Sequence, residues 1–256
     1  MKSLIKEIKS IKLVNTIRNN LNYRTNPFSL EKTKYSSVSD AFLWRTDGGY
    51  STIFKYTDIL KLFFKIKNSY VEIVFYSKDN HLIKRLNINN MNYSNELLIN
   101  SELLDGLKDY GTFYIYHLTN QKIEKENILS NRCYLGYSKD NDIYSYVHGN
   151  TLVKYKDINK KTIEETDIVN TSFYKNQNYK IQKYFGGFDK HELFFANPTS
   201  KVINFSIDKE NYKLKGGSTI MIEIFNKELI EINSNCLFFR PTVFSYNKKY
   251  FDVHHS

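Results

Sequence analysis

The feature that most constrains this chain is a strand, turn, strand pattern that occurs twice. Residues 69–88 read SYVEIVFYSKDNHLIKRLNI, and residues 200–215 read SKVINFSIDKENYKLK. In the first segment Val71, Ile73 and Phe75 alternate with their neighbours in the period-two pattern of a strand with one apolar face. The polar residues that follow supply turn chemistry. Each segment therefore predicts a β-hairpin.

The two segments keep one spacing. When Ser69 is superposed on Ser200, Val71 falls on Val202 and Asn80 falls on Asn211. The same offset also aligns the segment YGTFYIYHL, which follows Asp109, with PTVFSYNKK, which follows Arg240, to within one residue. This correspondence predicts a mainly β chain of two related antiparallel β-sandwich-like units with an N-terminal amphipathic helix. The expected divisions are an N-terminal helix and arm at 1–39, a first β-unit at 40–118, an insert and linker at 119–171, and a second β-unit at 172–256.

Composition agrees with a β-rich chain. Aromatic residues make up 16% of the sequence and hydrophobic residues 41%, which is ample for a core and favours pleated, half-buried surfaces. At 256 residues the chain is long enough for one large all-β domain or two ordinary ones.

The clearest helical pattern lies in residues 1–20. Leu4, Ile8 and Ile11 fall on one face, and lysines lie largely elsewhere. Such a basic amphipathic helix packs on its own domain, on a second copy of the chain to form a homo-oligomer, or on a membrane surface. The residues from Leu21 to Ser39, interrupted by Pro27, predict a loop or arm.

Three further segments give local predictions. The segment AFLWRTDGGYSTIFKY (41–56) has the form of a hairpin with its turn at Asp47 to Gly49. The run DILKLFFKIK (58–67) fits a strand or a short helix, and its place before a hairpin favours a strand. Ser101 is expected to cap a short helix over SELLDGLK.

The net charge of +10 raises the question of a polyanionic partner. Only six of the 37 basic residues are Arg, whereas base readout and bidentate phosphate recognition rely on Arg. Lysines on outward strand faces account for the charge more simply, and they protect sheet edges from unwanted pairing. The sequence therefore makes nucleic acid an unfavoured partner. If the chain does bind a polyanion, the candidate site is the set of Lys and Tyr residues in YKNQNYKIQKYF (174–185).

Several kinds of site and location are not indicated. Cys133 and Cys236 stand apart in hydrophobic surroundings and predict buried free thiols, not a zinc or redox motif. We expect no metal and no cofactor. No apolar run is long enough for a membrane span, and no signal peptide is apparent, so a cytoplasmic location is expected.

The histidines supply the candidates for acid–base chemistry. None of the six lies in a metal-binding motif. A structural or surface role is common for such residues, and the alternative is a general base. The candidate bases are His117, His148 and His254.

The densest cluster of functional residue types is RCYLGYSKDNDIYSYVHGN (132–150). Its repeated tyrosines predict a platform on which a sugar ring or a base could stack, and a tyrosine ladder between strands is the alternative. The predicted ligand-binding residues are Trp44, Arg45, Arg132, Tyr137 and His148.

Five short sequences point to a known family: FLWR at Phe42, YGTFYIYH at Tyr110, RCYLGY with YSYVHGN, FFANPTS at Phe194, and the C-terminal RPTVFSYNKKYFDVHHS. In these the chain resembles a family of uncharacterised bacterial proteins associated with surface-polysaccharide gene clusters. The resemblance implies a bacterial glycan context and no particular catalytic residue. The first expectation is a binding or accessory protein for a sugar or nucleotide sugar. The alternatives are a sugar-modifying enzyme with a His general base and a Lys/Tyr polyanion binder.

Overall fold

The computed structural model describes residues 13–14, 17 and 35–255, with gaps at 122–126, 131–132, 150–151, 158–164, 170, 172–176, 183–186, 227–228, 237–238 and 249. Strands account for 59% of the described residues, so the prediction of a mainly β chain is confirmed. The single helix with defined bounds in this part of the chain is α3 (Ile59–Phe64). The strands of the described residues form five four-stranded sheets, which we number I to V.

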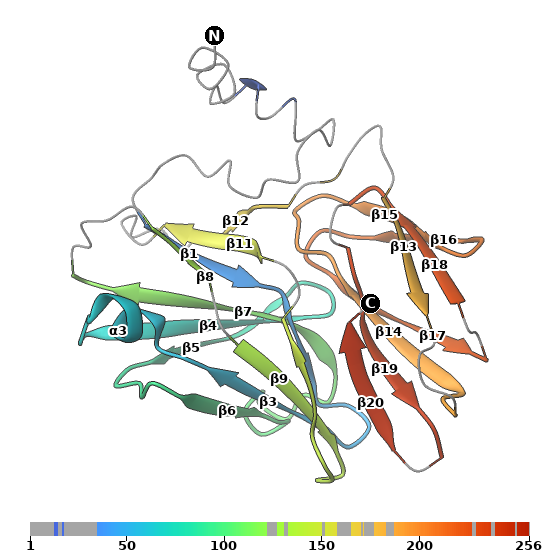
Figure 1. Ribbon diagram of the computed structural model, residues 1–256, viewed down its shortest axis with the longest axis horizontal. Coiled ribbons are helices and arrows are strands. Elements are labelled where there is room, and N and C mark those ends of the chain that lie inside the picture. Colours follow the sequence, from blue (N-terminus) through green and yellow to red (C-terminus); the bar gives the residue numbers. More distant parts are fainter. Residues whose placement is uncertain are drawn as a thin grey trace.

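Sheets I, II and III lie on the left of Figure 1. Sheet I has the order β12-β11-β1-β8 and comprises β12 (Thr166–Asp167), β11 (Leu152–Asp157), β1 (Tyr35–Asp40) and β8 (Asn127–Ser130). Sheet II has the order β2-β7-β4-β5 and comprises β2 (Phe42–Arg45), β7 (Tyr110–Thr119), β4 (Ser69–Ser77) and β5 (Leu82–Ile88). Sheet III has the order β10-β9-β3-β6 and comprises β10 (Ser145–His148), β9 (Cys133–Lys139), β3 (Tyr50–Tyr56) and β6 (Asn95–Ile99).

Sheets IV and V lie on the right of the same view (Figure 1). Sheet IV has the order β13-β18-β15-β16 and comprises β13 (Gln177–Gln182), β18 (Leu229–Ser234), β15 (Ile203–Ile207) and β16 (Glu210–Leu214). Sheet V has the order β17-β14-β19-β20 and comprises β17 (Thr219–Phe225), β14 (Lys190–Ala196), β19 (Thr242–Tyr246) and β20 (Phe251–His255). The strand pairs are antiparallel except β1 with β8, which run parallel.

The central strands β7 of sheet II and β14 of sheet V are buried on both faces. On β7 of sheet II, Phe113 and Ile115 enter one hydrophobic cluster, whereas Tyr114 enters a second. On β14 of sheet V, Phe194 belongs to the first cluster and Phe195 to the second. Because alternate residues of a strand point to opposite faces, each of these strands contributes to both clusters.

The fold prediction of two β-sandwich-like units is therefore wrong. Each of the two large hydrophobic clusters combines side chains from both predicted units. The ring of Phe244 lies 5.6 Å from that of Tyr50, and the ring of Phe194 lies 5.1 Å from that of Tyr110. The small sheets are instead arranged like a four-bladed propeller. Their strands are not simple consecutive meanders as in propeller blades, since sheet II combines β2, β7, β4 and β5.

The predicted hairpins at the two related segments are present. Strands β4 and β5 pair antiparallel, and so do β15 and β16. The recurrence of four-stranded sheets agrees with an internal repeat, although only at the level of sheet size. The strands that follow the two hairpins in the predicted repeat, β7 and β19, are placed differently. β7 pairs with β4 in sheet II, whereas β19 lies in sheet V and does not pair with β15 of sheet IV.

The predicted hairpin over 41–56 is a corner between two sheets. β2 pairs with β7 in sheet II, and β3 pairs with β6 and β9 in sheet III. The turn that the sequence predicts does form, because the Tyr50 amide donates to the carbonyl of Asp47 at 2.9 Å. All four residues of β2 are buried, which favours packing between two sheets over an exposed hairpin.

The segment 58–67 forms helix α3 and not the strand that its position favoured. Asp58 caps it by accepting a hydrogen bond from the Lys61 amide at 3.0 Å, and Lys65 ends it with φ of 58°. A second oxygen of Asp58 accepts from the Ser69 hydroxyl at 2.6 Å. Six residues are too few for a helical period to show in the sequence.

Two other local predictions differ from the structure. Residues 101–106 form turns instead of a helix, and the Asn100 side chain accepts from the Leu103 amide at 2.9 Å. Residues 35–40 of the predicted arm form strand β1. Its Ser37 and Ser39 hydroxyls accept from the amides of His117 and Ile115, so they extend the hydrogen bonding of β7 where β2 has ended.

The predicted N-terminal helix lies outside the described residues except for Leu13, Val14 and Ile17, so an amphipathic helix is not shown. The expectations that this segment packs on its own domain, on a second copy of the chain or on a membrane surface therefore also concern residues outside the described part of the chain. Within the described residues no helix is long and apolar enough to cross a membrane.

Candidate functional site

Two of the predicted ligand-binding residues, Trp44 and Tyr137, are core residues with no exposed surface. The Trp44 indole donates to the carbonyl of Tyr76 at 2.9 Å, and a side chain at Gly111 would collide with both groups. The Tyr137 hydroxyl donates to the carbonyl of Leu43 at 2.8 Å. A ring without exposed surface cannot stack on a ligand, so both residues hold sheets together instead.

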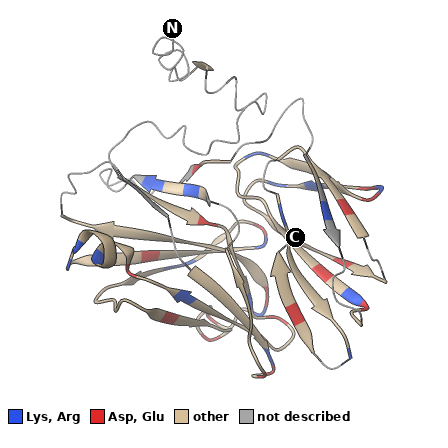
Figure 2. Ribbon diagram, in the orientation of Figure 1, with Lys and Arg blue, Asp and Glu red and all other residues tan. Residues whose placement is uncertain are grey.

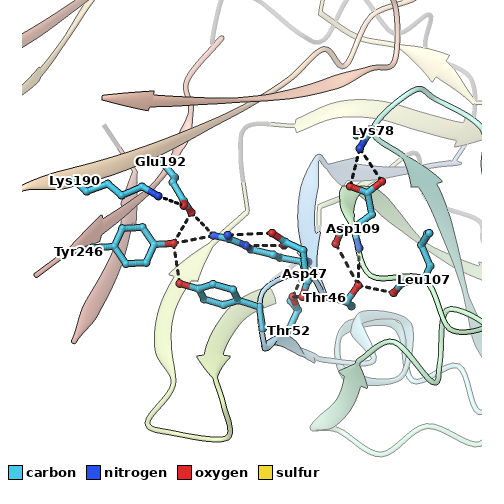
Figure 3. A network of polar contacts seen from close by, with 11 residues as sticks. Thr46, Asp47, Thr52, Lys78, Leu107, Asp109, Lys190, Glu192 and Tyr246 are labelled. Atoms are coloured by element: carbon cyan, nitrogen blue, oxygen red, sulfur yellow. Dashed lines mark hydrogen bonds and ion pairs between the residues drawn. The ribbon is translucent and has the colours of Figure 1, made fainter. Parts of the chain in front are cut away.

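Arg45, the third predicted ligand residue, is 4% exposed and lies within a polar network that joins sheets II, III and V. Figure 3 labels Asp47, Glu192 and Tyr246 of this network. The Nε of Arg45 donates to Asp47 at 2.8 Å, and its Nη1 donates to Glu192 at 2.6 Å and to the hydroxyl of Tyr246 at 2.9 Å. Its guanidinium carbon lies 3.9 Å from the centre of the Tyr50 ring.

The hydroxyls of this network are mutually satisfied. Tyr50 donates to the Tyr246 hydroxyl at 2.8 Å, and Tyr246 donates to Glu192, which also accepts from Lys190 at 2.9 Å. Burial raises the pKa of Tyr50 to about 12 and raises that of Tyr246 further, so both phenols stay protonated. Burial alone would raise the pKa of Glu192, but the charge of Arg45 and the bonds from Tyr246 and Lys190 lower it below its ordinary value. The network is thus a closed structural cluster with few donors left for a ligand.

Sequence reasoning found one member of this network and missed the others: Asp47, Tyr50, Lys190, Glu192 and Tyr246. Arg45 and Glu192 are 147 positions apart, so no local pattern could have paired them.

The three candidate bases occupy different environments. His117 is fully buried on β7. His148 is exposed at the end of β10, and its ring centre lies 5.0 Å from that of His255. His254 lies on β20, where its Nε2 is 3.0 Å from the Ser245 hydroxyl, which is itself 2.8 Å from Nδ1 of His191. Burial lowers the pKa of His254, which keeps the imidazole neutral near pH 7.

Arg132, the remaining predicted ligand residue, lies outside the described residues. Several positions of the candidate polyanion segment 174–185 also lie outside the described residues. The described part of that segment, residues 177–182, forms β13. Lys180 of that strand pairs with Glu231 at 2.6 Å. In Figure 2 the Lys and Arg positions are spread over the described strands and mixed with Asp and Glu.

Neither thiols nor metal ligands form a reactive centre in the described part of the chain. Cys133 and Cys236 are buried, as the sequence predicted. Burial raises the pKa of Cys236 to about 12, which leaves it an inert thiol. Among the described residues no three His, Cys, Asp or Glu side chains are grouped so that they could hold a metal ion.

The outer face of sheet III carries an exposed aromatic surface. Its pairing register places two rows side by side: His148, Tyr134, Lys55 and Glu96 in one, and Tyr146, Gly136, Ile53 and Leu98 in the next. We call its exposed members the tyrosine platform: Lys55, Glu96, Leu98, Tyr134, Tyr146 and His148.

The two platform tyrosines are unusually accessible for aromatic residues on a sheet. Tyr134 is 60% exposed and Tyr146 is 45% exposed. Tyr146 lies across Gly136, because a Cβ at that glycine would come within 2.6 Å of both the Tyr146 ring and Ile53. The Lys55 ammonium lies 5.0 Å from the centre of the Tyr146 ring and 3.4 Å from Glu96. The platform therefore offers aromatic faces bordered by charged and polar groups.

Part of the segment 132–150, which the sequence predicted to form a stacking surface, lies on this face. The exposed residues there differ from those predicted. Tyr134 and Tyr146 point outward from two neighbouring strands, whereas Tyr137 points into the core. Lys55, Glu96 and Leu98 were missed because they come from strands β3 and β6, which only the fold brings beside β9.

Comparison with known proteins gives no matching family model and no matching curated protein. Solved structures with some similarity include an α-L-rhamnosidase of Streptomyces avermitilis complexed with L-rhamnose and an anti-sigma factor domain-containing protein. The first is 7% identical with a TM-score of 0.24, and the match covers 87% of this chain and 26% of the rhamnosidase. The second is 10% identical with a TM-score of 0.21, over 84% of this chain and 80% of the other. TM-scores this low do not establish a common fold.

Proposed function

We propose that the chain is a carbohydrate-binding protein whose tyrosine platform stacks against the rings of a sugar or nucleotide sugar. The observation that carries the proposal is the pair of exposed rings, Tyr134 and Tyr146, on one face of sheet III. Their Cα atoms are diagonal neighbours across the strand pair, at the roughly 7–8 Å spacing that aromatic side chains can span. The exposed face of an aromatic ring suits the apolar face of a pyranose ring.

The polar border of the platform supports the same ligand class. Lys55, Glu96 and His148 are exposed beside the tyrosines and offer both donors and acceptors to hydroxyl groups. Lys55 and Glu96 already form an ion pair, so the border has little net charge and does not favour a polyanion. The sequence resemblance to proteins of surface-polysaccharide gene clusters suggests a bacterial surface glycan as the natural context.

The test is binding of the full chain to a glycan array and to nucleotide sugars, with titration of the best ligand. Tyr134→Ala and Tyr146→Ala should each weaken binding about tenfold, or about 1.4 kcal/mol. His148→Ala should weaken it less. Tyr250→Ala is a matched control, because Tyr250 is 57% exposed and directly precedes β20 of sheet V, outside the tyrosine platform. Equal affinities for all four variants and the wild type would refute the platform as the site.

A second candidate function is favoured by the contact of His254 with a hydroxyl. With its pKa lowered, a neutral His254 3.0 Å from Ser245 has the arrangement of a general base beside a nucleophile or relay. This candidate is a sugar-modifying enzyme. It predicts turnover of a nucleotide sugar that falls at least 100-fold in His254→Ala, with the exposed His81→Ala as control. Turnover unchanged in His254→Ala would refute it.

A further inference from the structure

Helix α3 carries an exposed apolar surface at the end of the molecule away from sheets IV and V, on the left of Figure 1. Phe63 is 66% exposed and Leu62 is 39% exposed. Tyr93, in the loop between β5 and β6, is 54% exposed and lies beside the helix, because the Lys61 ammonium is 5.1 Å from the centre of its ring. We call Leu62, Phe63 and Tyr93 the α3 patch. Neighbouring exposed apolar side chains mark a contact surface, whereas isolated ones do not.

The side chains that anchor α3 are different from those of the patch. Ile59 and Leu60 are buried and form a hydrophobic cluster with Ile66, against which Phe64 packs. Phe63 is not part of that cluster and projects from the surface. The helix is therefore held in place without Phe63, and this residue can be replaced without opening a cavity in the core.

Lysines border the α3 patch. Lys61 lies within α3, and the exposed Lys65 and Lys67 follow it in the chain. Among the described residues none of the three pairs with a carboxylate, and the ammonium groups of Lys61 and Lys65 donate to backbone carbonyls. Asp58, which caps the helix, is 1% exposed and accepts hydrogen bonds from the Lys61 amide and from a hydroxyl. The edge of the patch is therefore basic.

We propose that the α3 patch docks the chain on the surface of an anionic phospholipid membrane. Phe63 and Leu62 enter the boundary between the head groups and the acyl chains, and Tyr93 lies at the level of the head groups. The three lysines lie along the membrane surface and are attracted to the lipid phosphates.

Charge selects this occupant over a second copy of the chain. A symmetric dimer through the α3 patch would bring the same three lysines of both copies together, and like charges across an interface are unfavourable. An anionic lipid surface instead supplies the negative charge that the lysines lack. No residue of the tyrosine platform takes part, so the proposal does not depend on glycan binding.

Cosedimentation of the full chain with lipid vesicles tests the proposal. Vesicles of phosphatidylcholine mixed with phosphatidylglycerol should bind the chain at least about tenfold more tightly than vesicles of phosphatidylcholine alone. Phe63→Ser should weaken binding to the anionic vesicles about tenfold, because an exposed aromatic ring no longer enters the lipid. The double variant Lys65→Gln, Lys67→Gln should weaken it by about the same factor and make it less sensitive to salt.

Matched control variants change the same residue types elsewhere. Phe225→Ser alters a side chain that is 55% exposed at the end of β17. The double variant Lys201→Gln, Lys209→Gln alters two exposed lysines on either side of β15. Both should bind anionic vesicles as the wild type does. Equal losses in the α3 and control variants would overturn the proposal, and so would wild-type or undiminished variant binding that does not follow the expected order.

Phe63→Trp reports whether the side chain enters the lipid. The natural chain has a single tryptophan, Trp44, which is fully buried. A blue shift of the fluorescence on addition of anionic vesicles therefore comes from position 63 and is the expected result. An unshifted spectrum with the protein bound to vesicles would overturn the proposal. Self-association without lipid that Phe63→Ser abolishes, measured by analytical ultracentrifugation, would also overturn it by assigning the patch to a second copy.

Discussion

Arg45 and Glu192 form a buried ion pair across the molecule, with Nη1 2.6 Å from Oε2 and side-chain exposures of 5% and 7%. Arg45 ends β2 of sheet II, and Glu192 lies in β14 of sheet V. The pair therefore couples the two halves of the fold that Figure 1 shows on the left and right. A buried pair of this kind is costly to break, because the remaining charge stays desolvated.

Arg45→Gln is accordingly expected to lower the free energy of unfolding by about 3–5 kcal/mol. Urea denaturation of the variant and the wild type measures the difference. Lys180→Gln is the matched control, since the Lys180–Glu231 pair is exposed at 57% and 41% and should contribute less than about 1 kcal/mol. A similar small loss in both variants would show that the Arg45 network does not stabilise the fold.

The same network predicts a loss of stability in acid. The folded chain holds the pKa of Glu192 below the ordinary 4.5, so the folded state binds a proton less readily than the unfolded chain. This contribution is fully present above pH 4.5 and is lost as the pH falls through the lower folded value. Glu192→Gln, although less stable overall, should show a shallower decline in stability below pH 4.5. Parallel declines in the two proteins would contradict the assignment.

Asp40 predicts the opposite pH dependence. Burial raises its pKa from 3.8 to about 7. The folded state therefore keeps a proton that the unfolded chain releases, and stability should fall as the pH rises from about 4 through 7. Asp40→Asn should remove this fall, as measured by urea denaturation at pH 4.5 and pH 8. The exposed Asp79→Asn serves as control, and an unchanged difference between the two pH values in Asp40→Asn would refute the prediction.

Gly136 sets the position of Tyr146 on the tyrosine platform. A Cβ at this position would come within 2.6 Å of the Tyr146 ring and of Ile53. Gly136→Ala is expected to displace the Tyr146 side chain, which is 45% exposed, and to weaken glycan binding. It should also lower stability, because the new Cβ meets the γ-methyl of Ile53, which is only 7% exposed. Calorimetric titration measures the affinity and circular dichroism checks the fold. Ser51→Ala, a small change on neighbouring β3, is the control, and equal affinity in both variants would count against the role of Tyr146.

The roles of Trp44 and Tyr137 are tested by stability and not by binding. Trp44→Phe removes the donor to the Tyr76 carbonyl and leaves space beside Gly111, so it should cost about 2–4 kcal/mol. Glycan affinity of the folded fraction should be unchanged. A loss of affinity without a loss of stability would return Trp44 to the binding site.

Some features followed from the sequence because their causes are local. The period-two pattern at 69–77 and 203–207 predicted strands, and the polar residues after each predicted hairpins that the structure contains. The hydrophobic surroundings of Cys133 and Cys236 predicted their burial. The density of tyrosines in 132–150 pointed to the strands that carry the platform.

The tertiary structure decided everything that depends on which strands become neighbours. A pattern of alternation cannot say whether the second face of a strand meets water or another sheet, so β4, with Val74 and Phe75 both fully buried, was expected to have one buried face and has two. Likewise Arg45 could not be assigned to a core network until β14 and β19 brought Glu192 and Tyr246 to it. The sequence by itself determined the strands that have a clear period-two pattern and the turns that follow them, because those causes are local. Long-range packing determined which side chains are buried and which remain on the surface.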